Sequence, residues 1–196
     1  TTLVVLVCLW IRNHYRETKE KIAKIDEVFA MAQYGSAHSP PELIEDGNTA
    51  VFIVGNSRGG GLHALLWVQR MFPNHFQNFV FMNARTVDSK AYGGREALEA
   101  MRVDASVSLN YFVNFCRSHG LRAKSYLSFG TDAVEELTTL AKQVAENHPN
   151  AIFFTSKLVF EDENILTRLL HNQAALELQR RLHNAGQQMV ILPMRL

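Results

Sequence analysis

VFIVGNSRGGGLH (residues 51–63) carries an apolar run through a glycine-rich turn into a segment of helix-forming residues. A short apolar run that ends at a glycine is typical of a buried β-strand. The same succession of a short apolar run and a long helical segment recurs along residues 48–196. Such alternation predicts an α/β fold, in which helices cover both faces of a doubly wound, five-stranded parallel sheet.

The elements of this sheet can be placed on the sequence. The strands are expected at residues 50–54, 78–83, 123–128, 151–155 and 189–192. The helices are expected at residues 61–72, 96–119, 132–147 and 163–185. Sheets of this class bind ligands beyond the carboxyl ends of the strands, where the strand order reverses. With a strand order of 3-2-1-4-5, that crevice lies between the loops after the first and fourth strands.

Composition narrows the range of functions. Apolar residues make up 47% of the 196 residues and charged residues 20%, as in an ordinary globular domain. Twenty basic residues stand against nineteen acidic ones, so no long-range field favours nucleic acid as a partner. The two cysteines, Cys8 and Cys116, indicate a reducing compartment and no disulfide framework. The histidines lack metal-site spacing, so no metal ligands are assigned.

The N-terminal residues predict a membrane attachment. Residues 1–11 form an uncharged apolar run, about half the length of a membrane span, and are interpreted as the end of a truncated transmembrane helix. Basic residues follow the run, as at the cytoplasmic end of a span: Arg12, Arg16, Lys19, Lys21 and Lys24. Residues 12–33 are then a cytoplasmic exit helix, residues 34–47 a linker, and residues 48–196 the α/β domain. The alternative is a buried strand at residues 3–10.

The loop after the first strand is the first candidate ligand site. Its residues are Gly55, Asn56, Ser57, Arg58, Gly59, Gly60 and Gly61. Glycines let backbone N–H groups face an anion, the following helix adds its positive end, and Arg58 could add a fork of donors. The loop could therefore cradle a phosphate, although it has neither a dinucleotide nor a Walker spacing. The alternative is a tight turn that needs glycine for close packing.

The same loop also contains a G-x-S-x-G motif, from Gly55 to Gly59. In α/β-hydrolases this motif is the nucleophile elbow, so a serine hydrolase that uses Ser57 is a further alternative. Its triad would need an acid and a histidine later in the chain, and Asp132 with His171 or His183 has the right order. Both histidines fall inside the expected last helix, however, which argues against this alternative.

The end of the fourth strand is the second candidate ligand site. Thr155, Ser156 and Lys157 supply polar groups there. Three carboxylates follow at residues 161–163, where they favour the start of a helix and oppose an approaching phosphate. No catalytic residue is assigned at either end of the crevice.

With strands and loops placed, residues 48–196 resemble the universal-stress-protein-like fold, which is similar to the adenine nucleotide alpha hydrolase-like fold. The resemblance implies the strand order 3-2-1-4-5. Nucleotide-binding members of that family carry a G-x-x-G motif, followed nine residues later by G-[ST], after the fourth strand. Residues 156–164 contain no glycine. The resemblance therefore implies the fold without ATP binding in the usual manner of the family.

The segment Ile11-Arg12-Asn13-His14-Tyr15-Arg16 after the apolar run resembles the exit from the last membrane helix of bacterial permeases of the amino acid-polyamine-organocation superfamily. Residues 170–173, 179–183 and 191–194 strengthen the likeness to the cytoplasmic tail domain of such a permease. The resemblance implies the cytoplasmic face of a bacterial cell membrane, the chain's own transport domain as a partner, and a homodimer. We expect a regulatory or assembly domain of an amino acid, or related cation, transporter, without catalytic activity and without a cofactor. The alternative is a nucleotide-binding universal-stress-type protein.

Overall fold

The computed structural model describes residues 41–55, 57–87, 94–159 and 173–195, together with Val5, Leu9, Arg12 and Arg16. At residues 94, 95, 157–159, 173, 194 and 195 it describes the backbone alone. The predicted α/β class is confirmed, because strands and helices alternate along the described chain.

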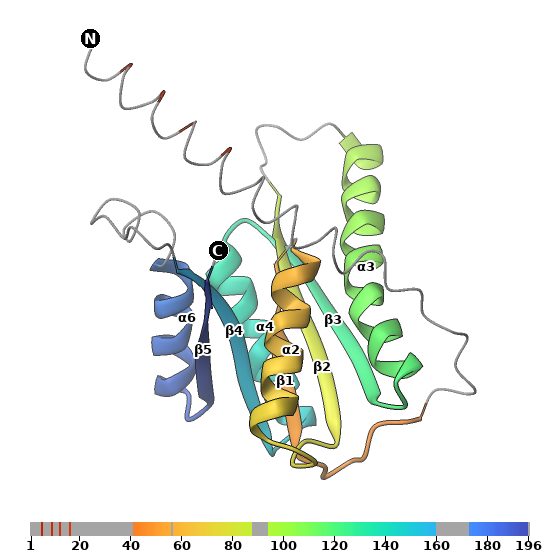
Figure 1. Cartoon of the computed structure of the whole chain (residues 1–196). Helices are drawn as coiled ribbons and strands as arrows, with labels where there is room; N and C mark the ends of the chain where they lie inside the picture. Colours follow the sequence, from red (N-terminus) through yellow and green to blue (C-terminus); the bar gives the residue numbers. More distant parts are fainter. Residues whose placement is uncertain are drawn as a thin grey trace.

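Five parallel strands form one sheet in the order β3-β2-β1-β4-β5 (Figure 1). They are β1 (Thr49–Ile53), β2 (Asn78–Thr86), β3 (Arg122–Gly130), β4 (Ala151–Val159) and β5 (Gln188–Arg195). β1 lies at the centre, paired with β2 on one side and β4 on the other. Its carboxyl end is thus the point where the strand order reverses, as the sequence predicts.

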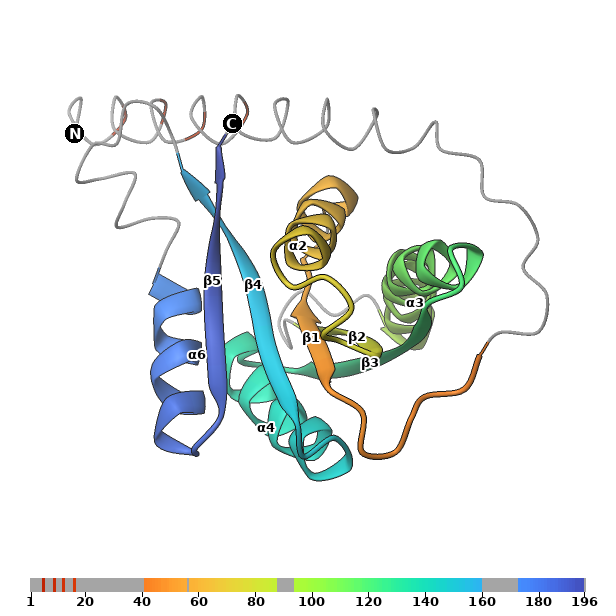
Figure 2. The ribbon, with the colours of Figure 1, turned by 60° about the horizontal axis from the view of Figure 1, so that its bottom comes forward.

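The helices are α2 (Arg58–Met71), α3 (Gly94–Ser118), α4 (Ala133–Asn147) and α6 (Gln173–Asn184). α2 and α3 cover one face of the sheet, and α4 and α6 cover the other (Figures 1 and 2). Right-handed crossovers produce this division, because the chain steps outward from β1 to β3 and then returns across the sheet to β4. The sheet therefore has two separate hydrophobic layers.

The layer under α2 and α3 is built around stacked aromatic rings. Phe81 stacks on Phe52 at a centroid distance of 5.3 Å and on Phe112 of α3 at 5.1 Å, and Phe52 also stacks on Phe154 at 5.7 Å. All four rings are buried. Because adjacent strands present these rings side by side, they tie α3 to the three central strands.

The opposite layer is aliphatic. Alternate residues of the central strands, Val51, Val80 and Phe153, point away from the aromatic stack and pack against α4 and α6. The helices contribute Leu140, Ala141, Val144, Leu178 and Leu182. Both faces of β1 are therefore buried, which explains its uninterrupted apolar sequence.

β4 and β5 are longer than the sequence indicates. Strand ends were expected at residues 155 and 192, yet Ser156 pairs with Leu192 and Lys157 with Pro193, and the ladder continues to Val159 and Arg195. β1 ends earlier, where Ile53 pairs with Thr155. The expected loop at residues 156–159 is thus wrong. Polar residues had suggested that β4 ends at residue 155. They are accommodated because β4 continues past the end of β1, where it pairs with β5 alone.

Helix boundaries differ from expectation by a few residues at most places. α2 begins at Arg58, three residues before the expected start, because the glycine run is its first turn. Asp132 caps α4: its side chain accepts hydrogen bonds from the backbone N–H groups of Val134 and Glu135 at 2.8 and 3.0 Å. The first half of the expected last helix, residues 163–172, lies outside the described residues, and α6 starts at Gln173.

Four described residues come from the N-terminal region. Val5, Leu9, Arg12 and Arg16 are helical and exposed. Their spacing places them on one helical face. Within the residues that the structure describes, no helix combines the length and the hydropathy that a membrane crossing requires. The rest of the predictions for residues 1–40 falls outside the described residues.

Candidate functional site

The ligand crevice was predicted at the carboxyl edge of β1 and β4. The loop of residues 54–57 leads from β1 into α2, and Thr155 of β4 lies beside the end of β1 (Figure 2). The Thr155 hydroxyl donates a hydrogen bond to the carbonyl oxygen of Ile53 at 3.3 Å. The fold thus brings the two predicted ligand segments to the same edge, next to each other.

Ser57 is the N-cap of α2. Its Oγ accepts a hydrogen bond from the backbone N–H of Gly60 at 3.0 Å, and its backbone is extended, with φ −82° and ψ 117°. A serine acceptor at this position satisfies one of the first N–H groups of a helix. The hydroxyl therefore occupies a place that an anion would otherwise take, and the backbone lacks the strain of a nucleophile elbow.

Replacing Ser57 with alanine should lower the free energy of unfolding by about 1 kcal/mol, because the cap of α2 is lost. Ser57→Asp should retain most of the stability, since a carboxylate accepts the same hydrogen bond and suits the positive helix end. Urea denaturation of the three proteins measures this difference. Equal stability of Ser57→Ala and the parent chain would contradict the capping role.

Arg58 extends toward α3 and not along the crevice. Its guanidinium carbon lies 4.9 Å from the ring centroid of Tyr111. A guanidinium over an aromatic face is stabilised by the ring quadrupole. In this arrangement Arg58 joins the start of α2 to α3, so its predicted role as a phosphate donor would require the side chain to leave Tyr111.

The glycines of the loop divide into two kinds. Gly59, Gly60 and Gly61 are buried in the first turn of α2, and a Cβ atom at Gly61 would collide with the Phe112 ring. Gly55 is exposed, with no atom within 4 Å of the place of a Cβ. The close-packing interpretation therefore accounts for Gly61, whereas open space remains beside Gly55. Asn56 lies outside the described residues.

Ser156 and Lys157 belong to β4 itself. Ser156 is half-buried, and its backbone pairs with Leu192 of β5. Lys157 pairs with Pro193, and the structure describes its backbone alone. These two residues therefore lie on a strand beyond the end of β1, and not in a loop that folds back over Gly55.

The residues of the proposed hydrolase triad are apart. Asp132 caps α4 at the carboxyl edge of β3. His183 lies near the end of α6, at the amino edge of the sheet, where its Nε2 accepts a hydrogen bond from the N–H of Met189 at 3.3 Å. Ser57 stands at the carboxyl edge, opposite to His183, so His183 cannot take a proton from its hydroxyl. His171 lies outside the described residues.

Asn83 of β2 was not singled out from the sequence, yet its side chain reaches the loop that follows β1. Its Nδ2 donates to the carbonyl oxygens of Val54 at 2.6 Å and Gly55 at 3.4 Å. The side chain is only 5% exposed, and its Oδ1 is buried without a hydrogen-bond partner among the described residues. A buried acceptor of this kind favours a donor group on a ligand or a water molecule. The signal in the sequence was a polar residue that closes an apolar strand.

Cys116 is a buried thiol elsewhere in the domain. Burial raises the pKa of the Cys116 thiol to about 12, so the thiol stays protonated and is a poor nucleophile. Among the described residues, no three histidine, cysteine or carboxylate side chains gather as metal ligands would.

His148, which follows α4, is the described histidine with a shifted pKa. It is 6% exposed, and its two ring nitrogens have no hydrogen-bond partner among the described residues. Burial, with a smaller contribution from the positive charge of Lys124, lowers its pKa below the ordinary value. The imidazole is thus held neutral next to the Tyr126 ring, at a centroid distance of 6.5 Å.

Acidification should therefore destabilise the domain through His148. The unfolded chain binds a proton at this residue more readily than the folded one, so the stability is fully present above pH about 6.5 and is lost as the pH falls below it. The urea midpoint of the parent chain should drop between pH 7.5 and pH 5.5. His148→Gln should reduce this drop, and Lys124→Met should reduce it partly; an unchanged pH profile in His148→Gln would refute the assignment.

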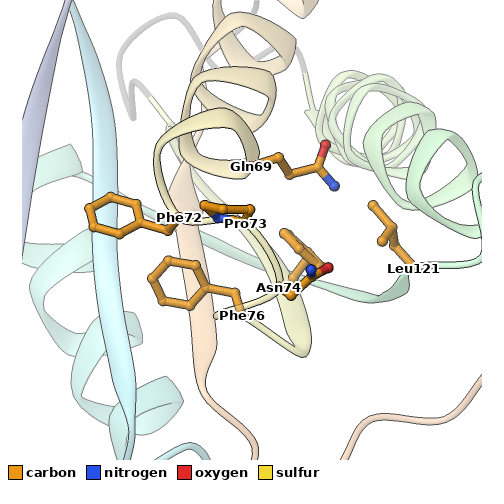
Figure 3. A pocket seen from close by; sticks show the side chains of 7 residues that line it. Gln69, Phe72, Pro73, Asn74, Phe76 and Leu121 are labelled. Atoms are coloured by element: carbon orange, nitrogen blue, oxygen red, sulfur yellow. The ribbon is translucent and has the colours of Figure 1, made fainter.

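A small pocket lies at the other edge of the sheet. It has a volume of about 180 Å³ and lies where α2 turns into β2, between Gln69, Asn74 and Leu121 (Figure 3). Pro73 and Asn74 form the turn, and Asn74 has a positive φ of 58°, as position three of a type II turn requires. The Phe72 and Phe76 rings point away from Leu121, toward β4 and β5. The pocket therefore does not belong to the predicted crevice.

The fold and the site define a class: a five-stranded parallel α/β domain of order 3-2-1-4-5, with a capped, glycine-rich helix start at the point where the order reverses. This arrangement agrees with a universal-stress-protein-like or nucleotide alpha hydrolase-like fold. Beyond the class, no protein family, curated protein or solved structure matches the chain. The function must accordingly be argued from the residues themselves.

Proposed function

We propose that the chain is a non-catalytic regulatory or assembly domain of a bacterial amino acid, or related cation, transporter, carried on the cytoplasmic face of the membrane. The observation that carries the proposal is the exposed helical face of Val5, Leu9, Arg12 and Arg16. Two apolar residues followed by two arginines on one face suit a helix that leaves the hydrocarbon at its cytoplasmic end. The resemblance of residues 11–16 to a permease exit segment supports the same interpretation.

The positions of the candidate catalytic side chains support a role without catalysis. The Ser57 hydroxyl caps α2, the Arg58 guanidinium stacks on Tyr111, and His183 lies at the far edge of the sheet. A hydrolase would need the serine and a histidine within hydrogen-bond reach. A domain that acts by binding its own transport domain, or a second copy of itself, needs no such pairing.

The test is made on the whole transporter. In proteoliposomes, removal of residues 48–196 should change the uptake rate or the association of subunits, while the transport domain itself remains folded. Size-exclusion chromatography with light scattering separates the two effects. The proposal fails if the gene encodes no transmembrane segments before Thr1, or if uptake and subunit association are the same with and without the domain.

A nucleotide-binding universal-stress-type protein is the second candidate, and one observation favours it. The space beside Gly55 and the buried Asn83 Oδ1 lie at the point where ligands bind in this fold. Calorimetric titration with adenine nucleotides and cyclic dinucleotides tests this function. Saturable binding that is lost in Asn83→Leu would support it, and absence of heat at millimolar nucleotide would exclude it.

A serine hydrolase can be tested in the same preparation. A fluorophosphonate probe should leave Ser57 unlabelled, because its hydroxyl caps α2 and His183 lies at the opposite edge of the sheet. Labelling of the parent chain that disappears in Ser57→Ala would overturn the non-catalytic proposal.

A further inference from the structure

Acidic residues are unevenly distributed over the two layers. Residues 49–87 and 105–131 contain no aspartate or glutamate. These stretches form β1, α2, β2, most of α3 and β3. The described carboxylates later in the chain belong to the opposite layer or lead into it: Asp132, Glu135, Glu136, Glu146 and Glu177. The first part of α3 carries Glu96, Glu99 and Asp104, and Asp104 pairs with Arg85, whereas α2 and the second part of α3 carry basic residues without acids.

The outer side of α2 is apolar within this layer. Leu66 is 43% exposed, Met71 54% and Phe72 43%. Trp67 is half-buried, packs edge-on against Phe72 at a centroid distance of 6.3 Å, and is followed by the exposed Arg70. We call these five residues the α2 patch. Figure 1 shows α2 in front of the sheet, with none of the described helices over it.

A helix on the surface of a soluble domain normally turns polar residues outward. The other exposed apolar pair of this layer, Val103 and Val107 of α3, alternates with Arg102, Asp104 and Ser106, so it is a mixed surface. The α2 patch has no such acids between its members. Apolar and aromatic residues that gather on one side of a helix mark an interaction surface.

We propose that the α2 patch docks on an anionic phospholipid surface. Leucine, methionine and aromatic rings can enter the boundary between headgroups and acyl chains, and tryptophan and arginine suit the headgroup level. Because α2 contains no acidic residue, the patch avoids repulsion from anionic headgroups, and each nearby cation adds about 1 kcal/mol of attraction. Arg70 lies within the patch, and Arg117 at the end of α3 belongs to the same layer.

The proposal rests on the proposed function in one respect. A domain tethered to a membrane meets the lipid surface at a high effective concentration, so a patch with low affinity for lipid is enough for docking. The N-terminal helical face would supply this tether. The patch itself, however, is defined by residues 66–72 alone, and it can be tested under a tether of another kind.

The experiment uses the full chain with Trp10→Phe, which leaves Trp67 as the single tryptophan. A histidine tag at the N-terminus holds the chain on vesicles through a nickel-chelating lipid. The vesicles contain phosphatidylcholine with or without phosphatidylglycerol, and brominated acyl chains serve as quenchers. Trp67 emission should fall by about half or more on brominated anionic vesicles, because its ring approaches the acyl boundary. The quenching should weaken at about 1 M salt, where the Debye length is about 3 Å.

Matched variants decide the outcome. The quenching should be abolished in the triple variant Leu66→Ser, Met71→Ser and Phe72→Ser. It should stay intact in the double variant Val103→Ser and Val107→Ser. Circular dichroism melts verify that both variants are folded. Unchanged Trp67 emission on brominated anionic vesicles would overturn the proposal, even if the patch then proved to bind a protein. The untagged chain tests the tether separately: failure to sediment with vesicles counts against the proposed membrane attachment, whereas quenching of the tagged chain still reports the patch.

Discussion

Phe81→Ala should destabilise the domain by about 3–5 kcal/mol. Phe81 is fully buried and stacks on both Phe52 and Phe112. Its removal leaves a cavity between β1, β2 and α3 and also ends two ring contacts, each worth about 0.5–1.5 kcal/mol beyond area burial. Because domains of this kind are stable by only about 5–15 kcal/mol, the variant should unfold at much lower urea concentration.

Two control variants test this prediction. Phe81→Leu retains most of the volume and should lose much less stability than the alanine variant. Val103→Ala removes an apolar side chain that is exposed on α3, and it should change the stability by less than about 0.5 kcal/mol. A loss in Phe81→Ala no larger than the loss in Val103→Ala would show that the aromatic stack does not hold the two elements together.

Gly61→Ala should also destabilise the domain, although alanine is a better helix former than glycine by about 1 kcal/mol. The added methyl group would collide with the Phe112 ring and approach Cγ1 of Val54 to 3.1 Å. Phe112 lies against Phe81 and cannot move aside, and overpacking of this kind costs about 1–3 kcal/mol or more. We therefore expect a net loss of about 1–2 kcal/mol in urea denaturation.

Gly55→Ala is the matched control for this substitution. It lies in the same loop with nothing within 4 Å of the added methyl, so its stability should stay within about 0.5 kcal/mol of the parent. The double variant Gly61→Ala with Phe112→Leu should recover part of the loss, because a smaller side chain makes room. Equal effects of Gly61→Ala and Gly55→Ala would mean that the glycine run is not needed for the packing of α2 on α3.

The α/β class could be predicted because β1 has an uninterrupted apolar sequence, and the strand order followed from the resemblance to the universal-stress-protein-like fold. A strand buried on both faces must lie inside a parallel sheet, and helical segments between strands then set the crossovers. The end of β4 could not be predicted, because Thr155, Ser156 and Lys157 resemble the polar end of a strand. Their pairing with β5 depends on a partner far along the chain, which no local pattern reveals.

The candidate site was predicted in position but not in detail. The edge and the two flanking segments follow from topology, so the end of β1 at Ile53 and Thr155 of β4 lie side by side. The direction of the Arg58 side chain depends on Tyr111, and the roles of Ser57 and Gly61 depend on where α2 begins. Asn83 was missed because a buried amide acts on carbonyl groups of a neighbouring strand, a contact that sequence spacing does not show.

The central position of β1 has a consequence for the chain while it is being made. β1 pairs with β4 only when residue 155 has appeared, 102 residues after residue 53. At a synthesis rate of about 5–20 residues per second, that interval is about 5–20 s. During this time one side of an apolar strand has open backbone groups that can pair with other chains. We therefore expect chaperones to bind the nascent chain until its second half arrives.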